Sequence, residues 1–186
     1  MEHIVVDPSI EKLEYGAFNR LKNLHTVEME SSVKEIEEKA FASCDALTTI
    51  SLSKGLKKIG KAAFANCKKL QSIDVPPSVE SIGPNAFDKC KALTTVTFHD
   101  GLVTIGWSAF SFCTSLKIIT IPKTVRTIED FAFIYCSGLE EVVLNPGLKE
   151  IGVRAFYDCK HLILLDVPAT VKKTGRAAFQ GTRLRL

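Results

Sequence analysis

The six cysteines are the residues of this chain that could most readily perform chemistry. A zinc site needs cysteine pairs roughly two to four residues apart, whereas neighbouring cysteines here are 23 residues apart. A nucleophilic thiol needs a base beside it, and the four histidines follow no common spacing. We therefore expect no metal site and no catalytic cysteine. The cysteines are Cys44, Cys67, Cys90, Cys113, Cys136 and Cys159, and the histidines are His3, His25, His99 and His161.

Their equal spacing predicts instead that the cysteines are small apolar residues of a packed core. Stacked coils of chain would bring successive Cα atoms to about 5 Å, a separation that a disulfide tolerates. Equivalent positions, however, do not specify which cysteines would pair. We therefore expect six reduced thiols that a thiol reagent reaches only after denaturation.

Two further signatures of an enzyme are missing. Acidic side chains on adjacent coils would permit general acid–base chemistry, but no two acids are neighbours in the outward strand position. A phosphate-binding loop needs clustered glycines, and the glycines here are single and periodic. The sequence therefore predicts no enzyme and no cofactor. The outward strand position holds Glu28, Ser51, Asp74, Thr97, Thr120, Val143 and Asp166.

One repeat of 23 residues positions all of these side chains. An Ala-Phe pair recurs at this interval without insertion or deletion, and its phenylalanines are Phe18, Phe41, Phe64, Phe87, Phe110, Phe133, Phe156 and Phe179. A cysteine follows three residues later in six of the units, a leucine three residues after that, and then aliphatic residues two apart. One unit cannot bury these side chains alone, so the period predicts a solenoid of stacked coils.

Within each unit the pattern predicts two strands and a turn. The alternation in residues 93–98 indicates a strand with one face inward, and adjacent coils would pair such strands into a parallel sheet at about 4.8 Å per coil. A second short strand is expected in residues 78–82. For residues 83–90 we expect a short helical or 3-10 turn on the opposite side, because Pro84 follows Gly83 and Ala86 lies four residues before Cys90.

The repeat resembles the BspA-like class of leucine-rich repeats. The stretches "VPPSVESIGPNAFDKC" (75–90) and "IPKTVRTIEDFAFIYC" (121–136) carry the resemblance, which covers essentially the whole chain. It implies a curved solenoid with a parallel β-sheet on its concave face. It also implies a surface or secreted protein that binds partners, for example in cell adhesion. No cap is recognisable at either end, so we expect residues 1–186 to form one solenoid of about eight coils with truncated or poorly capped ends.

A finer period of two units, 46 residues, is also present. Gly55, Gly101 and Gly147 alternate with hydroxyl residues such as Ser78 and Thr124 at the same repeat position. We interpret this alternation as a trace of pairwise duplication without a chemical role.

The composition excludes several classes of partner. The chain of 186 residues is 46% hydrophobic, with a net charge of +3 and no block of like charges, and its basic residues are interleaved with acids. No aromatic residues occupy the outward strand positions, so we expect no nucleic acid partner. No apolar run approaches the roughly 20 residues that would span a bilayer, and no signal peptide is evident. The compartment and the identity of any partner stay open.

The outward face of the longer strands is the best candidate for function. Solenoids use such extended faces to bind partners, although threonine is also simply a good strand residue on a wet surface. We expect a binding or adhesion module that recognises a protein or a glycan through this face. The alternative is a structural spacer that self-assembles through its open ends. The candidate ligand-binding residues are Ser72, Asp74, Thr95, Thr97, His99, Ile118, Thr120 and Glu141.

Overall fold

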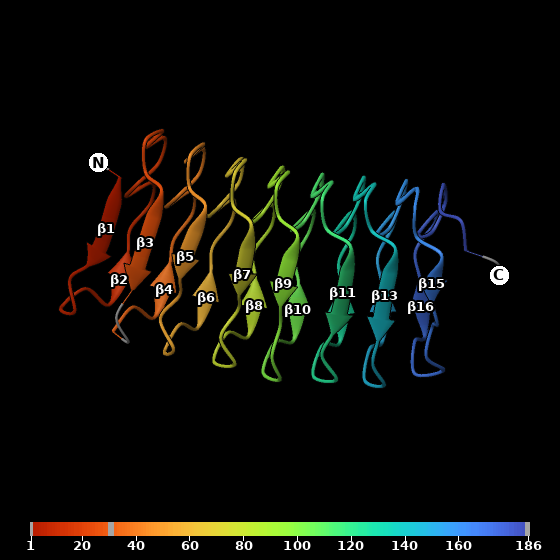
Figure 1. Cartoon of the computed structure of the whole chain (residues 1–186). Coiled ribbons are helices and arrows are strands. Elements are labelled where there is room, and N and C mark those ends of the chain that lie inside the picture. Colours follow the sequence, from red (N-terminus) through yellow and green to blue (C-terminus); the bar gives the residue numbers. More distant parts are fainter. Residues whose placement is uncertain (1, 30–31, 185–186) are drawn as a thin grey trace.

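The computed structural model describes residues 2–29 and 32–184, which form a stack of coils along one axis (Figure 1). Each coil contributes one longer strand, of three or four residues except in the last coil where it has two, and one short strand of two residues. The longer strands are β1 (His3–Val6), β3 (Thr26–Met29), β5 (Thr49–Ser51), β7 (Ser72–Asp74), β9 (Thr95–Thr97), β11 (Ile118–Ile121), β13 (Glu141–Leu144) and β15 (Leu164–Leu165). The short strands are β2 (Lys12–Leu13), β4 (Glu35–Ile36), β6 (Lys58–Ile59), β8 (Ser81–Ile82), β10 (Thr104–Ile105), β12 (Thr127–Ile128), β14 (Glu150–Ile151) and β16 (Lys173–Thr174).

Strands of neighbouring coils pair in parallel and in strict register. Thr95 of β9 lies opposite Ser72 of β7, an offset of one repeat, and the same offset holds in the other pairs. The short strands form one eight-stranded sheet, while the longer strands pair as β1-β3-β5, β7-β9 and β11-β13-β15. This arrangement confirms the predicted parallel solenoid and the second strand within residues 78–82.

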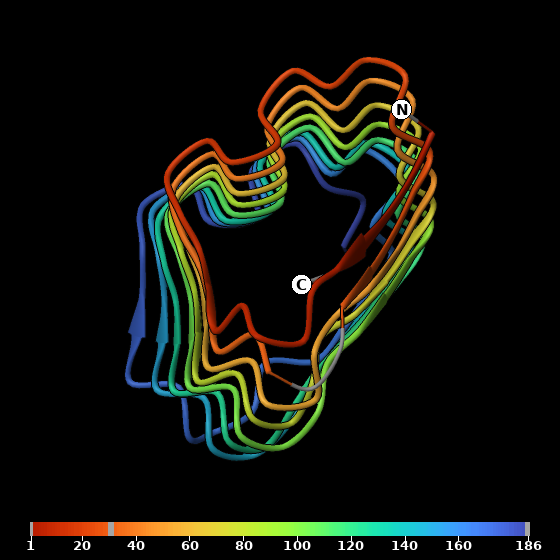
Figure 2. The same ribbon diagram turned by 90° about the vertical axis from the view of Figure 1, so that its left-hand side faces the viewer.

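The view along the stack shows how the two rows of strands are placed (Figure 2). The coils lie one behind another with a progressive shift from each to the next, with the longer strands on one side, the short strands on the other and the Ala-Phe turns joining them at one end. We call the outward side of the longer strands the long-strand face. Among the described residues, no helix exists that could cross a lipid bilayer.

The phenylalanines of the Ala-Phe pairs form a continuous stack through the core. Successive rings from Phe18 to Phe179 lie 5.0 to 5.7 Å apart between centroids and are nearly parallel. The six rings between these two ends are fully buried. Each such contact contributes about 0.5–1.5 kcal/mol beyond simple burial. The stack therefore ties every coil to both of its neighbours.

The cysteines form a second buried row, as the spacing predicted. All six side chains are fully buried and unpaired. Each Sγ donates a hydrogen bond to a phenylalanine carbonyl of the preceding coil, as Cys90 does to Phe64 at 3.2 Å. Burial raises the pKa of Cys44 to about 11 and that of Cys136 to about 12. The thiols are therefore protonated and inaccessible, which suits packing and not catalysis.

The prediction of a helical or 3-10 turn at residues 83–90 was wrong. Asn85 and Lys89 have φ of 56° and 59°, in the left-handed region that interrupts a right-handed helix. The N–H groups of Asn85, Phe87 and Lys89 donate to carbonyls of the next coil at 2.7 to 2.8 Å. Because these donors are used between coils, this side of the solenoid is a third hydrogen-bonded ladder made of turns. All of the other coils also have left-handed residues at these two positions.

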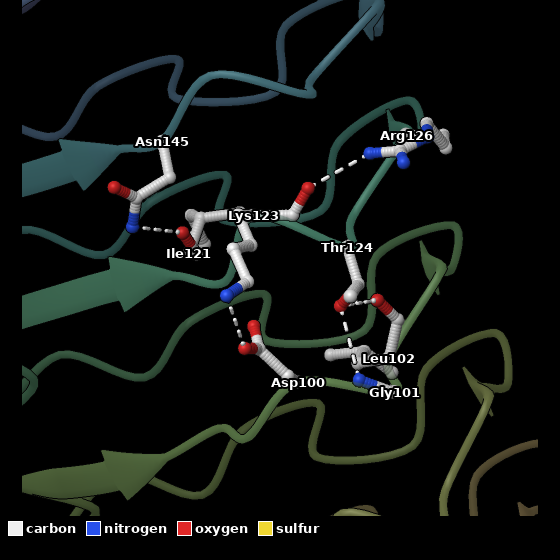
Figure 3. A network of polar contacts seen from close by, with 8 residues as sticks. All are labelled: Asp100, Gly101, Leu102, Ile121, Lys123, Thr124, Arg126 and Asn145. Atoms are coloured by element: carbon white, nitrogen blue, oxygen red, sulfur yellow. Dashed lines mark hydrogen bonds and ion pairs between the residues drawn. The ribbon is translucent and has the colours of Figure 1, made fainter.

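The 46-residue alternation, for which the sequence suggested no role, has a structural cause. Thr124 Oγ1 accepts the N–H of Gly101 at 3.1 Å and donates to the carbonyl of Leu102 at 2.7 Å (Figure 3). A Cβ on Gly101 would lie 2.0 Å from the carbonyl oxygen of Pro77 on the other side, and its φ is 131°. The turn at Gly101 thus fits between the turn at Pro77 in the preceding coil and the hydroxyl of Thr124 in the following coil.

The same contact occurs one pair of coils later. The N–H of Gly147 donates to Thr170 Oγ1 at 3.3 Å, and a Cβ on Gly147 would lie 2.2 Å from the carbonyl oxygen of Lys123. In these two pairs of coils, neighbouring coils therefore carry different turns that interlock. The N–H of Gly55, in the first pair, donates instead to Ser53 Oγ in its own turn at 3.2 Å.

Candidate binding surface

The long-strand face presents every second residue of each longer strand to solvent. In β11, Ile118 and Thr120 are exposed while Ile119 and Ile121 are fully buried. The inward side chains belong to the core, and parallel pairing with β13 holds the backbone of β11. The outward side chains are therefore carried on a rigid support, which reduces the entropy lost when a partner binds.

The structure places seven of the eight candidate residues on this face. Ser72 pairs with Thr95, Asp74 with Thr97, and Ile118 with Glu141. His99 follows β9 instead of lying in it. The structure therefore brings the candidates together as two neighbouring groups, on β7-β9 and on β11-β13. All are exposed except Glu141, which is half-buried.

His99 and Asp74 make the one close polar contact between candidate residues in the described part of the chain. His99 Nε2 lies 2.8 Å from Asp74 Oδ1. The pair borders a cavity of about 590 Å³ that Ser51 and Pro76 also line. An Asp-His pair could orient an imidazole, but Ser51 makes no hydrogen bond with His99 among the described contacts. Nor do the described residues contain a group of three or more side chains that could hold a metal ion.

Four exposed aliphatic side chains gather on the C-terminal part of the face. They make up four of the ten large apolar side chains exposed in the described residues. Contiguous exposed apolar groups edged by polar residues are typical of protein interaction sites. We call this group the aliphatic patch: Ile118, Val143, Ile163 and Leu164, exposed by 53%, 37%, 55% and 56%.

Polar side chains surround the aliphatic patch. Glu141 pairs with Ile118 on one side and with Leu164 on the other, so a carboxylate lies between two exposed aliphatic residues. Lys117 and Glu140, just before β11 and β13, form an ion pair at 2.6 Å, and this pairing lowers the pKa of Glu140. A hollow of about 490 Å³ lies over β13 and β15. The patch is thus a group of exposed aliphatic side chains with one carboxylate, Glu141, among them and an ion pair at its edge.

The candidate set from the sequence includes one residue of the patch, Ile118, and the neighbouring Glu141, but not Val143, Ile163 or Leu164. Ile163 was missed because it directly precedes β15, outside the predicted outward positions. A signal did exist, since the same repeat position is polar in the preceding coils, as at Lys117 and Glu140. An aliphatic residue at a position that is polar elsewhere is a departure that the repeat makes visible.

Exposed aromatic residues on the opposite side of the coils were also missed. Trp107 and Phe112 are exposed by 44% and 36%. Trp107 packs edge-on against Phe131 at 5.8 Å, and Phe112 stacks on Tyr135 at 4.7 Å between ring centroids. Trp107 and Phe131 occupy different repeat positions, so the period does not reveal that they are neighbours, whereas Phe112 and Tyr135 are 23 residues apart and the period does place them side by side.

The comparison with protein families agrees with the repeat and the fold. The model of the BspA type leucine rich repeat region matches in 6 copies, over residues 1–91 and 57–185. The chain belongs to this family. A comparison with curated proteins finds no match.

Solved structures share the same architecture. A leucine-rich repeat protein from Bacteroides ovatus is 25% identical with a TM-score of 0.66, over 98% of this chain and 65% of that one. A leucine-rich repeat protein from T. pallidum is 29% identical with a TM-score of 0.71, over 98% and 77%. A third, from Eubacterium ventriosum, is 22% identical with a TM-score of 0.77, over 100% and 60%. This chain thus spans only part of each relative.

Proposed function

We propose that this chain is a non-enzymatic binding module that holds a protein partner against the aliphatic patch. The observation that carries the proposal is the gathering of Ile118, Val143, Ile163 and Leu164 on the long-strand face. Covering these side chains removes apolar surface from water, the main driving force of most protein association.

The side chains of the patch favour a protein over a glycan. Exposed aliphatic residues with polar groups at their edge match the apolar centre and polar rim of protein interfaces. No aromatic ring, which a sugar could stack against, is exposed among the described outward residues of the face. The hydroxyl residues Thr95 and Thr97 on β9 extend the contact surface beyond the patch. These threonines would orient the partner and add little to the free energy of binding, because their hydrogen bonds to the partner replace hydrogen bonds to water.

Selection from a random peptide library against the intact chain tests this function. We expect selected peptides rich in apolar residues whose binding is lost in the Ile118→Arg, Leu164→Arg double variant, because charged side chains would be buried against the partner. The matched control is Thr49→Arg, Ser51→Arg on β5, which adds the same charge to the same face away from the patch. Peptides that bind the patch variant and the intact chain equally well would contradict the proposal. Thermal unfolding of each variant would establish that it is folded.

A further inference from the structure

A hollow of about 320 Å³ lies beside Trp107, on the side of the coils away from the long-strand face. Gly152 and Gly175 line it and contribute no side chains. They cannot carry any, since a Cβ on either would lie 2.3 to 2.4 Å from the backbone nitrogen of a residue in the preceding coil. The half-exposed indole of Trp107 borders the hollow. Its volume is at the small end of ligand sites, which begin at roughly 300 Å³, and suits a single side chain.

Two carboxylates in the hollow are held in fixed orientations. Glu129 Oε2 accepts the backbone N–H of Trp107 at 2.8 Å, and Asp130 Oδ1 accepts the backbone N–H of Val153 at 2.6 Å. In the described contacts, the second oxygen of each carboxylate has no hydrogen-bond partner. Each therefore has one oxygen anchored to a neighbouring coil and one available to a ligand. Anchoring of this kind positions a site before its ligand arrives.

Glu129 interrupts a run of glycines in its row of the repeat. The same position is glycine in Gly60, Gly83, Gly106, Gly152 and Gly175 and glutamate in Glu14 and Glu37, and of the three glutamates only Glu129 lies one coil after Trp107. Asp130 in turn occupies the repeat position of Trp107. The indole and both carboxylates thus come from two adjacent coils.

The charge of the hollow is opposite to that of the whole chain. Glu129, Asp130 and Glu150 line it together with one cation, Lys173, which pairs with Glu150 at 3.5 Å. Three carboxylates and one ammonium leave two negative charges, while the chain carries a net charge of +3. A cation over the face of an indole is attracted by the ring, and tryptophan is the strongest of the aromatic side chains in this respect.

We infer that the hollow beside Trp107 binds a lysine or arginine side chain of a protein partner. The alkyl stem of the side chain lies along the indole, and its charged end donates to the free oxygens of Glu129 and Asp130. Such charge-assisted hydrogen bonds are the stronger class. A neutral sugar could also stack on the indole, but two anchored carboxylates in a hollow of net negative charge favour a cation. The site is separate from the long-strand face, so one partner or two could occupy both.

Trp107 is the single tryptophan of the chain, so its fluorescence reports on this hollow directly. We would titrate the intact chain with a flexible Gly-Ser peptide that contains several lysines. The matched probe is the same peptide with every lysine acetylated, which removes the charge and keeps the stem. We expect a saturable change in fluorescence with the lysine peptide and none with the acetylated peptide. An equal response to both, saturation by a neutral oligosaccharide such as cellopentaose, or no saturable response would overturn the inference.

Isosteric variants locate the binding. Glu129→Gln and Asp130→Asn keep an oxygen that can accept the backbone N–H and remove only the charge. We expect each to weaken binding of the lysine peptide about two- to fivefold, the range of a single exposed ion pair. Glu14→Gln is the control, because Glu14 occupies the same repeat position as Glu129 in a coil far from Trp107. Loss of affinity in Glu14→Gln equal to that in Glu129→Gln would show binding to the overall charge and contradict the site.

Discussion

The inward and outward rows of the longer strands differ in how much they vary between coils. At the first inward position of the longer strands every residue is aliphatic, and Val27, Ile73 and Ile119 at this position are almost fully buried. At the outward positions next to them, hydroxyl, acidic and aliphatic residues follow one another, as in Thr97, Glu141 and Leu164. Both rows share one backbone and one register. The comparison teaches that the inward row maintains the fold in every coil, while the outward row can differ locally and create a site in a few coils.

Removing one ring from the core stack should produce the largest effect. Phe110 stacks on Phe87 and Phe133 at 5.0 and 5.3 Å and meets Phe98 edge-on. Phe110→Ala should lower the free energy of unfolding by about 3–5 kcal/mol, measured by urea denaturation. The outward control Thr97→Ala should change it by less than about 0.5 kcal/mol. Similar losses in the two variants would remove the distinction between inward and outward rows.

The interlocked glycine turns should give the next largest effect. Gly101→Ala places a Cβ against the carbonyl of Pro77 at a φ of 131°, so it should cost about 1–3 kcal/mol of stability. Gly16→Ala is the matched control: its φ is 63°, its nearest neighbour would be 3.7 Å away, and Ala62 occupies the same repeat position. Its cost should be about 1 kcal/mol or less. Equal costs would show that the close approach to Pro77 is not the cause.

The cysteine row should respond to alkaline pH through unfolding. Burial raises the pKa of Cys136 to about 12, so the folded thiol keeps its proton at pH values where an unfolded thiol has lost it. The thiols should therefore destabilise the fold as the pH rises above the unfolded thiol pKa, about 8.5, toward 12.

The rate at which the thiols react with a reagent measures their burial in the native chain. At pH 8 the native chain should react with a coloured disulfide reagent only as fast as it unfolds, and all six thiols should react at once in denaturant. Rapid reaction of any thiol in the native chain would contradict its burial. The Cys113→Ala variant should not slow the reaction of the other five thiols with the reagent.

The smallest effect on stability should come from the aliphatic patch. Ile118→Thr with Leu164→Thr makes this part of the face resemble the hydroxyl-rich part on β9. Both side chains are more than half exposed, so the free energy of unfolding should stay within about 0.5 kcal/mol. Binding of an apolar fluorescent dye to the native chain should nevertheless fall, because the exposed apolar area shrinks. Unchanged dye binding would show that the patch does not act as one apolar surface.

The repeat in the sequence was enough to predict the coil of 23 residues, the two rows of parallel strands, and the burial of the Phe and Cys rows. Periodicity determines these features because a side chain that recurs at a fixed interval meets its own kind in the next coil. Only the tertiary structure decided the path of the Ala-Phe turns, since left-handed φ at residues such as Asn85 and Lys89 has no signature in residue type. It also decided which exceptions to the repeat become neighbours, as Trp107 with Glu129. Such groups depend on single side chains that face one another across coils, and a contact made once leaves no period in the sequence.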